Sequence, residues 1–136
     1  MERMSLNNLI SEADGKKLLQ IAAGSIAHGL KTGKPLKLDL DKLPPAFSEM
    51  RATFVTLKVH GGLRGCIGNL QAVQPLASDV SDNAFNAAFR DPRFAPLKEV
   101  EFKNLQVFIS VLSPMEPMAF RTEEEFVKLL RPGVYG

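Results

Sequence analysis

The sequence is poor in the side chains that most often build cross-links and metal sites. It has one cysteine, Cys66, and two histidines, His28 and His60. A single cysteine excludes a disulfide within the chain, so nothing indicates an oxidising compartment. The three residues show neither a CxxC nor an HxxxH spacing, which argues against a tetrahedral zinc site. We therefore expect no bound metal.

Long apolar runs are also missing. The longest stretch without Asp, Glu, Lys or Arg covers only residues 65–78, whereas a membrane-spanning helix needs about 20 largely apolar residues. At the N-terminus, Glu2 and Arg3 leave no room for the apolar core of a secretory signal. We expect a cytoplasmic protein that does not contact membranes.

Charge of one sign is not concentrated anywhere. The chain has 17 Lys and Arg against 15 Asp and Glu, a net charge of +2. Binding to nucleic acid needs clustered basic side chains that neutralise phosphates, so we expect no nucleic-acid partner. The segment GGLRGCIG has glycines but lacks both the GK[ST] ending and the GxGxxG spacing, which excludes the common phosphate-binding loops.

What the sequence does have is hydrophobic periodicity. Apolar residues recur at helical spacing over 11–30, after a serine and acidic residues that favour a helix start. The stretch that follows, up to Pro44-Pro45, indicates a long, partly extended connection. A second helix is predicted over 75–91, and a capping box at Thr122-x-x-Glu125 predicts a third.

The strands are predicted between these helices. Residues 53–59 alternate with period two, and Gly61-Gly62 would turn the chain into a second strand over 63–67. Residues 105–112 (LQVFISVL) are almost wholly apolar, which predicts a central strand buried on both faces. Hence we predict one α+β domain over residues 1–136, with helices packed on an antiparallel or mixed sheet in two layers.

The second predicted strand carries the residues best suited to chemistry. Cys66 follows Arg64 by two residues, so both side chains lie on one side of an extended strand. A guanidinium near the sulfur would lower the thiol pKa and favour the nucleophilic thiolate. Gly65 and Gly68 would let a ligand or another backbone come close. The alternative is a small buried cysteine with Arg64 at the surface.

Whether Cys66 has a base depends on the hairpin. A turn of two or four residues around Gly61-Gly62 places Leu57 opposite Cys66 and sends His60 to the other face. A turn of three residues would bring His60, Arg64 and Cys66 onto one face, where the imidazole could activate the thiol. The dipeptide Gly-Gly favours the two-residue turn.

A second group of functional candidates follows the second predicted helix. Asp91 is a candidate general base and Arg93 a candidate clamp for an anion. The structural alternative is that Asp91 ends the helix before proline, Arg93 pairs with an acid and Phe94 fills the core. Asn69 is suited to hydrogen-bonding a ligand or to a simple Gly-Asn turn.

The run ATFVTLKVHGGLRGCIGNLQAVQPLASDV, with DNAFNAAFRDPRFAPL, ISVLSPMEP and LLRPGVYG, resembles the AMMECR domain family, also called AmmeMemoRadiSam system protein A. The resemblance covers roughly residues 10–136 and is most specific at LRGCIG and DPRF. It implies an α/β fold in which the LRGCIG strand borders a cleft. Family members continue beyond the equivalent of Gly136, so we expect this chain to lack the C-terminal strand and helix.

The resemblance leaves the biochemistry open. It implies an uncharacterised enzyme or binding domain, with no cofactor specified. Our leading hypothesis is a small-molecule enzyme, or enzyme component, in which Cys66 is the thiolate nucleophile assisted by Arg64. Gly65, Gly68, Asn69 and Arg93 would then bind the ligand. The alternative is a non-catalytic adaptor whose LRGCIG segment shapes a groove for a ligand or protein partner. The family's gene neighbourhood points to Memo-like and radical-SAM proteins as partners, and the oligomeric state is open.

Overall fold

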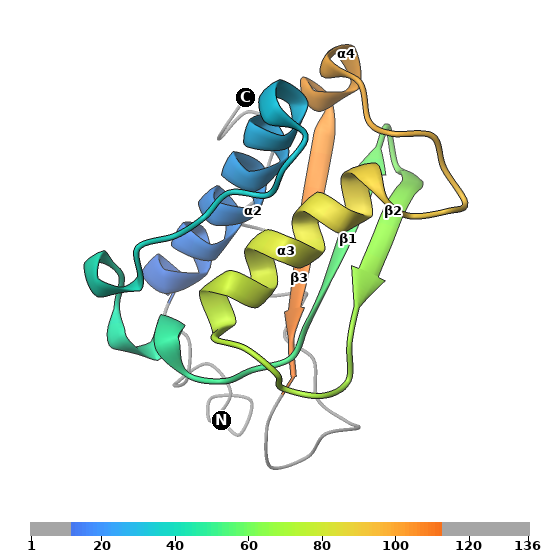
Figure 1. Ribbon diagram of the computed structural model, residues 1–136. Coiled ribbons are helices and arrows are strands. Elements are labelled where there is room, and N and C mark those ends of the chain that lie inside the picture. Colours follow the sequence, from blue (N-terminus) through green and yellow to red (C-terminus); the bar gives the residue numbers. More distant parts are fainter. Residues whose placement is uncertain (1–11, 113–136) are drawn as a thin grey trace.

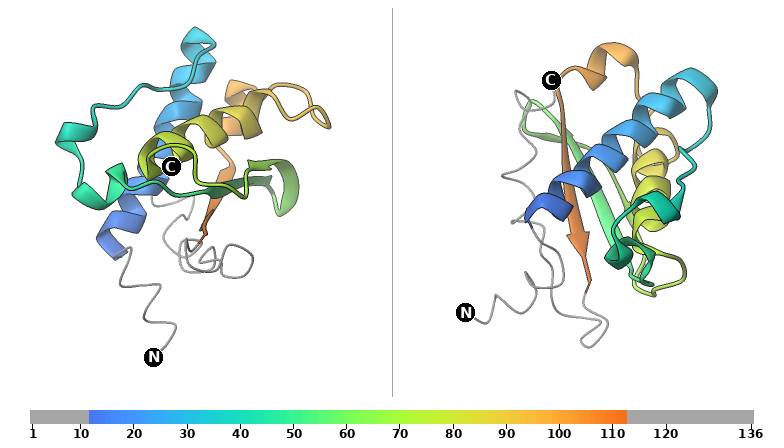
Figure 2. Two further views of the ribbon diagram at one scale, coloured as in Figure 1. Left: turned by 60° about the horizontal axis from the view of Figure 1, so that its bottom comes forward. Right: turned by 90° about the vertical axis from the view of Figure 1, so that its left-hand side faces the viewer.

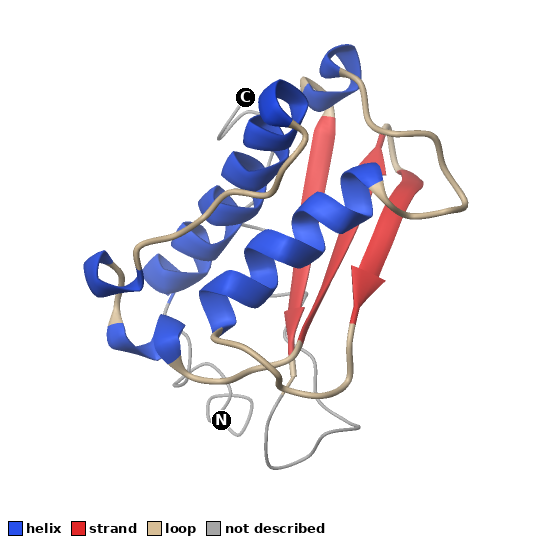
Figure 3. Cartoon of the chain, in the orientation of Figure 1, coloured by secondary structure: helices blue, strands red, loops and turns tan. Residues whose placement is uncertain are grey.

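The protein folds as helices packed on a three-stranded antiparallel sheet, which confirms the predicted α+β class (Figures 1 and 3). The computed structural model describes residues 12–112. The elements in chain order are α2 (Glu12–Thr32), η1 (Leu40–Lys42), η2 (Pro45–Ser48), β1 (Thr53–Val59), β2 (Gly62–Gly68), α3 (Leu76–Phe89), α4 (Glu99–Phe102) and β3 (Leu105–Val111). Ser11 and the helix predicted from Thr122 lie outside the described residues. No helix in the described range has the length and apolarity needed to cross a bilayer.

The strand order is β2-β1-β3, so β1 is the central strand of the described sheet. Within this described sheet residues 105–112 lie at the edge, whereas the prediction placed them at the centre. In β3, Val107 and Ile109 are buried, but Phe108 between them is only half-buried. Ile109, Ser110 and Val111 are all buried, so both faces of β3 are covered only toward its end. The alternating β1 takes the centre of the described sheet because both neighbours pair with it.

Helices α2 and α3 both lie on one face of the sheet (Figure 2). Beneath them Val55, Leu57 and Ile109 have no exposed surface. Burying each of these side chains contributes roughly 1.5–3 kcal/mol. A Cβ atom at Gly29 would approach the rings of Phe85 and Phe89 to less than 3 Å, so this glycine lets the two helices come close.

Buried polar groups tie α3 to β1. The Asp79 Oδ2 atom accepts hydrogen bonds from the backbone N–H of Thr53 at 2.9 Å, from its hydroxyl at 2.7 Å and from Asn83 Nδ2 at 3.1 Å. Burial raises the pKa of Asp79 above its ordinary value, and the hydrogen bonds from Thr53 and Gln74 oppose that rise. Because a buried acceptor needs its donors, this cluster fixes the start of α3 against β1.

The β1–β2 hairpin has a two-residue turn, as predicted, but the turn lies one residue earlier than Gly61-Gly62 and the register differs. Val59 pairs with Gly62, so the turn residues are His60 and Gly61, with φ of 52° and 81°. Positive φ at both positions is typical of the tight turn that suits a twisted hairpin. A bulge at Arg64 then shifts the register by one residue, and Thr56, not Leu57, lies opposite Cys66.

Candidate functional site

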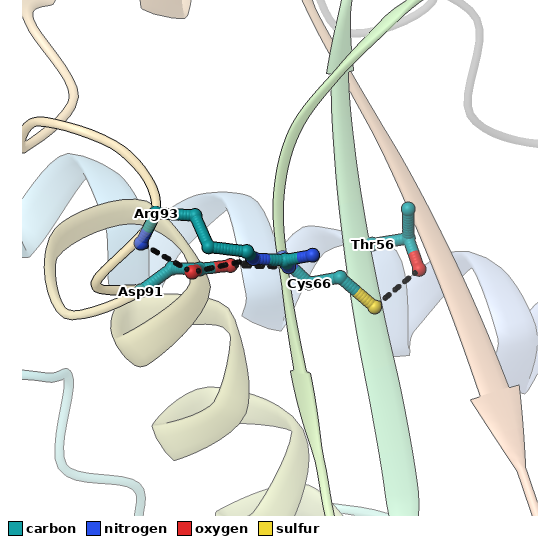
Figure 4. Close-up of polar contacts among 4 residues, drawn as sticks. All are labelled: Thr56, Cys66, Asp91 and Arg93. Atoms are coloured by element: carbon teal, nitrogen blue, oxygen red, sulfur yellow. Dashed lines mark hydrogen bonds and ion pairs between the residues drawn. The ribbon is translucent and has the colours of Figure 1, made fainter.

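Cys66 lies on the face of the sheet that neither α2 nor α3 covers. Its neighbour Gly65 faces α3 instead, since side chains alternate along a strand. Cys66 is half-buried, and its Sγ atom lies 3.2 Å from the Oγ1 atom of Thr56 on the central strand (Figure 4). Sequence reasoning missed Thr56, because the bulge that brings it opposite Cys66 leaves no clear signal in the residues themselves.

The two glycines of the motif are used for close packing. A Cβ atom at Gly65 would lie 2.1 Å from the backbone oxygen of Ala87 in α3. A Cβ atom at Gly68 would lie 2.3 Å from the ring of Phe54. The close approach predicted at these positions is therefore to the protein itself, and their role in ligand binding stays a prediction.

Asp91 holds the backbone of the cysteine. Its Oδ2 atom accepts a hydrogen bond from the Cys66 N–H at 3.0 Å, on the outer edge of β2 (Figure 4). The same carboxylate accepts three hydrogen bonds from Arg93. Its Oδ1 atom accepts from the Arg93 backbone N–H and from Arg93 Nε, both at 3.0 Å. Its Oδ2 atom accepts from Arg93 Nη2 at 2.7 Å. Asp91 is 3% exposed, so it sits buried between the α3 end and the strand.

These contacts decide what Asp91 can do chemically. The hydrogen bonds from Arg93 hold the pKa of Asp91 well below its ordinary value, with a smaller contribution from the Cys66 N–H. A carboxylate this weakly basic is a poor general base. The pKa of Arg93 is raised above its ordinary value, chiefly by its hydrogen bonds to Asp91. Asp91 thus holds the Arg93 side chain and the Cys66 backbone on the same carboxylate.

Arg64 is directed elsewhere. Its Nε atom donates to Glu101 Oε2 at 2.8 Å and its Nη2 atom to Glu101 Oε1 at 3.0 Å and to the Ala95 carbonyl at 2.8 Å. The guanidinium also lies over the ring of Phe94, 5.7 Å from its centroid. The Arg64 Nη1 atom is buried and has no hydrogen-bond partner within residues 12–112. Nothing described in the structure joins Arg64 to the Cys66 sulfur.

Two other predicted candidates are Asn69, whose side chain is hydrogen-bonded within the protein, and His60, which lies far from Cys66. The Asn69 side chain donates to the Gln71 carbonyl at 2.6 Å and accepts from Asn83 at 3.2 Å, which is turn chemistry. His60 lies in the hairpin turn, and four residues of extended strand between Gly62 and Cys66 span roughly 13 Å. The structure therefore brings Thr56, Cys66, Asp91 and Arg93 together, without an imidazole among them.

Three comparisons place these residues in a wider group. The AMMECR1 family model matches residues 19–136. A protein of Methanothermobacter thermautotrophicus is 40% identical over 127 residues, 93% of this chain and 66% of that protein. Protein SSO0193 of Saccharolobus solfataricus is 36% identical over 132 residues, 93% of this chain and 57% of that protein.

A solved structure gives the same fold. The crystal structure of the uncharacterised protein PH0010 from Pyrococcus horikoshii matches with a TM-score of 0.73 at 37% identity, over 78% of this chain and 54% of that chain. The chain thus spans roughly half to two thirds of the length of the relatives it matches.

Proposed function

Because the chain belongs to the AMMECR1 family, whose name specifies no reaction, we propose its function from the Cys66 site: a small-molecule enzyme or enzyme component with a thiolate nucleophile. The observation that carries the proposal is the arrangement of Figure 4. A half-buried thiol on the helix-free face lies beside the Thr56 hydroxyl, and the buried Asp91 carboxylate binds both the Cys66 backbone N–H and the Arg93 guanidinium.

Each residue has a distinct part in this proposal. The Cys66 thiol loses its proton to solvent, and its sulfur adds to a carbonyl carbon of the substrate. A carbon–sulfur bond forms as the carbon–oxygen π bond breaks, and the electron pair of that π bond moves to the oxygen. Thr56 donates its hydroxyl hydrogen to the thiolate. Arg93 favours the thiolate and binds an anionic group of the substrate. Asp91 is a positioning residue, since it holds both the Cys66 backbone and the Arg93 guanidinium.

A second candidate has its own support. Leu63, at the start of the motif, is 44% exposed on the edge strand, which suits a non-catalytic module that binds a ligand or protein beside LRGCIG. Exposed apolar residues at an edge strand are common in interaction surfaces. This adaptor needs the shape of the strand, whereas the enzyme needs the reactivity of the thiol.

Alkylation separates the two. We would treat the native protein with iodoacetamide from about pH 5 to about pH 10 and follow labelling by intact mass, with Cys66→Ser as the blank. For an enzyme we expect labelling well below the ordinary thiol pKa of about 8.5. Arg93→Met should move the profile upward, because it removes the adjacent cation. Arg64→Met is the matched control and should move it little, because Arg64 is bound to Glu101.

The outcomes are distinct. Protection of Cys66 at every pH in a folded protein would overturn the nucleophile and leave the adaptor as the better account. Normal reactivity with no difference between wild type and Arg93→Met would remove Arg93 from the mechanism.

A further inference from the structure

A pocket separate from the Cys66 site opens beside the first turns of α3. Its volume is about 370 Å³, and it is lined by Leu36, Lys37, Leu38, Gln74, Ser78 and Asp82. Ligand pockets commonly start at about 300 Å³. None of the lining residues takes part in the contacts around Cys66, so the pocket has no role in the function proposed above.

The wall formed by residues 36–38 is fixed from below by buried serines. The Ser81 hydroxyl donates to the Leu36 carbonyl at 2.8 Å, and the Leu36 N–H donates to Ser25 Oγ at 3.1 Å. Ser25 in turn donates to the Ser81 carbonyl at 2.8 Å. Both serines are at most 1% exposed. The segment is thus tied to α2 and α3 together, which makes the pocket largely preformed.

The opposite wall presents hydrogen-bond acceptors. Gln74 Nε2 donates to both Asp79 Oδ1 and Asp82 Oδ2, each at 3.2 Å. Both N–H groups of the amide are thereby used, so its remaining polar atom, Oε1, can only accept. Asp82 Oδ1 also has no partner in the described part of the chain. Two acceptors, one of them charged, therefore remain for a ligand that carries donors.

A cation lies on the wall formed by residues 36–38. Lys37 is exposed and forms no ion pair within residues 12–112, although it lines the same pocket as Asp82. Ser78 lies one turn before Asp82 on α3, so its hydroxyl belongs to the same wall as the acceptors. The pocket therefore has one side suited to a carboxylate and another suited to an ammonium group.

We propose that this pocket binds a free α-amino acid with an apolar side chain. Its carboxylate binds Lys37, its ammonium group binds Asp82 and Gln74 Oε1, and its side chain packs on Leu36 and Leu38. An inorganic anion would meet the Asp82 carboxylate, and a simple amine would leave Lys37 without a partner. A zwitterion pairs with both Lys37 and Asp82.

Titration of the isotope-labelled protein with L-leucine, followed by amide chemical shifts, tests the proposal. We expect saturable shifts confined to the residues around Leu36, Gln74 and Ser78. N-acetyl-L-leucine lacks the ammonium group and L-leucinamide lacks the carboxylate. Each should bind about tenfold more weakly, or worse, because each leaves a charged group of the pocket unpaired.

Two variants identify which wall recognises which group. Asp82→Asn keeps the acceptor for Gln74 but removes the charge, so it should weaken leucine about tenfold and leave N-acetyl-leucine unchanged. Lys37→Gln should weaken leucine and leave leucinamide unchanged. Lys31→Gln, at the exposed end of α2, is the control and should bind as wild type. Absence of saturable shifts, or equal binding of leucine and both blocked analogues, would overturn the proposal.

Discussion

The two faces of the same three strands have opposite characters. On the helix-covered face, Val55, Leu57 and Ile109 are completely buried. On the other face, directly alternating with them, Thr56, Cys66 and Phe108 are half-buried. Successive side chains of a strand point to opposite faces, so a shift of the register by one residue would exchange the core side chains with those on the face of the thiol.

The difference shows how one strand can carry side chains that stabilise the fold on one face and side chains that contact the thiol on the other. The covered face is stabilised by apolar burial and tolerates little change in volume. The other face is held by polar contacts: Thr56 to the sulfur, and Asp91 to the Cys66 backbone. Substitutions on the first face should therefore change mainly the free energy of unfolding, and substitutions on the second mainly the reactivity of Cys66.

The largest contrast is expected between neighbours on β1. Leu57→Ala should lower the free energy of unfolding by about 2–5 kcal/mol, because it opens a cavity under the helices. Thr56→Val, on the other face, should cost less than about 1 kcal/mol, since it keeps the β-branched shape. Urea denaturation of both variants measures the difference, and equal losses would contradict the distinction between the faces.

The two glycines of β2 should also differ. Gly65→Ala places a methyl group against the Ala87 carbonyl, where a Cβ atom would lie 2.1 Å away. It should cost roughly 1–3 kcal/mol by forcing β2 away from α3. Gly62→Ala meets nothing closer than 3.7 Å and should change stability by about 0.5 kcal/mol or less. A tolerated Gly65→Ala, judged by thermal melting, would show that the strand can shift freely.

The contributions of Asp91 and Asp79 to the free energy of unfolding should change with pH in opposite directions. The pKa of Asp91 is lowered in the folded state, so its contribution is present above the ordinary pKa of 3.8 and is lost as pH falls through the folded value. The pKa of Asp79 is raised, so its contribution is present below 3.8 and is lost as pH rises through the folded value.

Denaturation of the two asparagine variants at several pH values checks this. The stability gap between wild type and Asp91→Asn should narrow as pH falls below 3.8, whereas the gap between wild type and Asp79→Asn should widen there. Gaps that move in the same direction would refute the assignment of burial to one group and ion pairing to the other.

The smallest effect is expected at the ion pair beside the motif. Glu101→Gln removes the charge that faces Arg64 and should cost about 1 kcal/mol or less, because Glu101 is 29% exposed. Combined with Arg64→Met, the two losses should be less than additive in thermal melting. Alkylation of Cys66 should stay as in wild type. A marked change in alkylation would show that Arg64 acts on the thiol after all.

The sequence predicted α2, α3 and the three strands, because the period of the apolar residues follows the side chains that are buried. The prediction placed β1 at residues 53–59, where the structure has it, and β2 one residue late at its start and one early at its end. It placed residues 105–112 at the centre of the sheet, whereas β1 is the central strand of the described sheet. An apolar run does not show how many strands pair with it. It also missed α4, whose four residues carry too short a pattern.

The candidate site was harder to predict than the fold. Cys66 and Arg93 were identified from their chemistry, but their partners depend on the bulge at Arg64, which changes what lies opposite the sulfur. Glu101 was missed because its link to Arg64 crosses from α4 to β2, elements that no local pattern joins. Long-range pairs of this kind follow from the packing of the whole domain.

The hydrogen bond from Cys66 to Asp91 also bears on aggregation. β2 is an edge strand of the described sheet, and the Cys66 N–H points outward, where the strand of another molecule would pair. A carboxylate already occupies that donor, and its negative charge repels an incoming backbone carbonyl. A neighbouring chain would have to displace both Asp91 and the bound Arg93 before it could extend the sheet at this point.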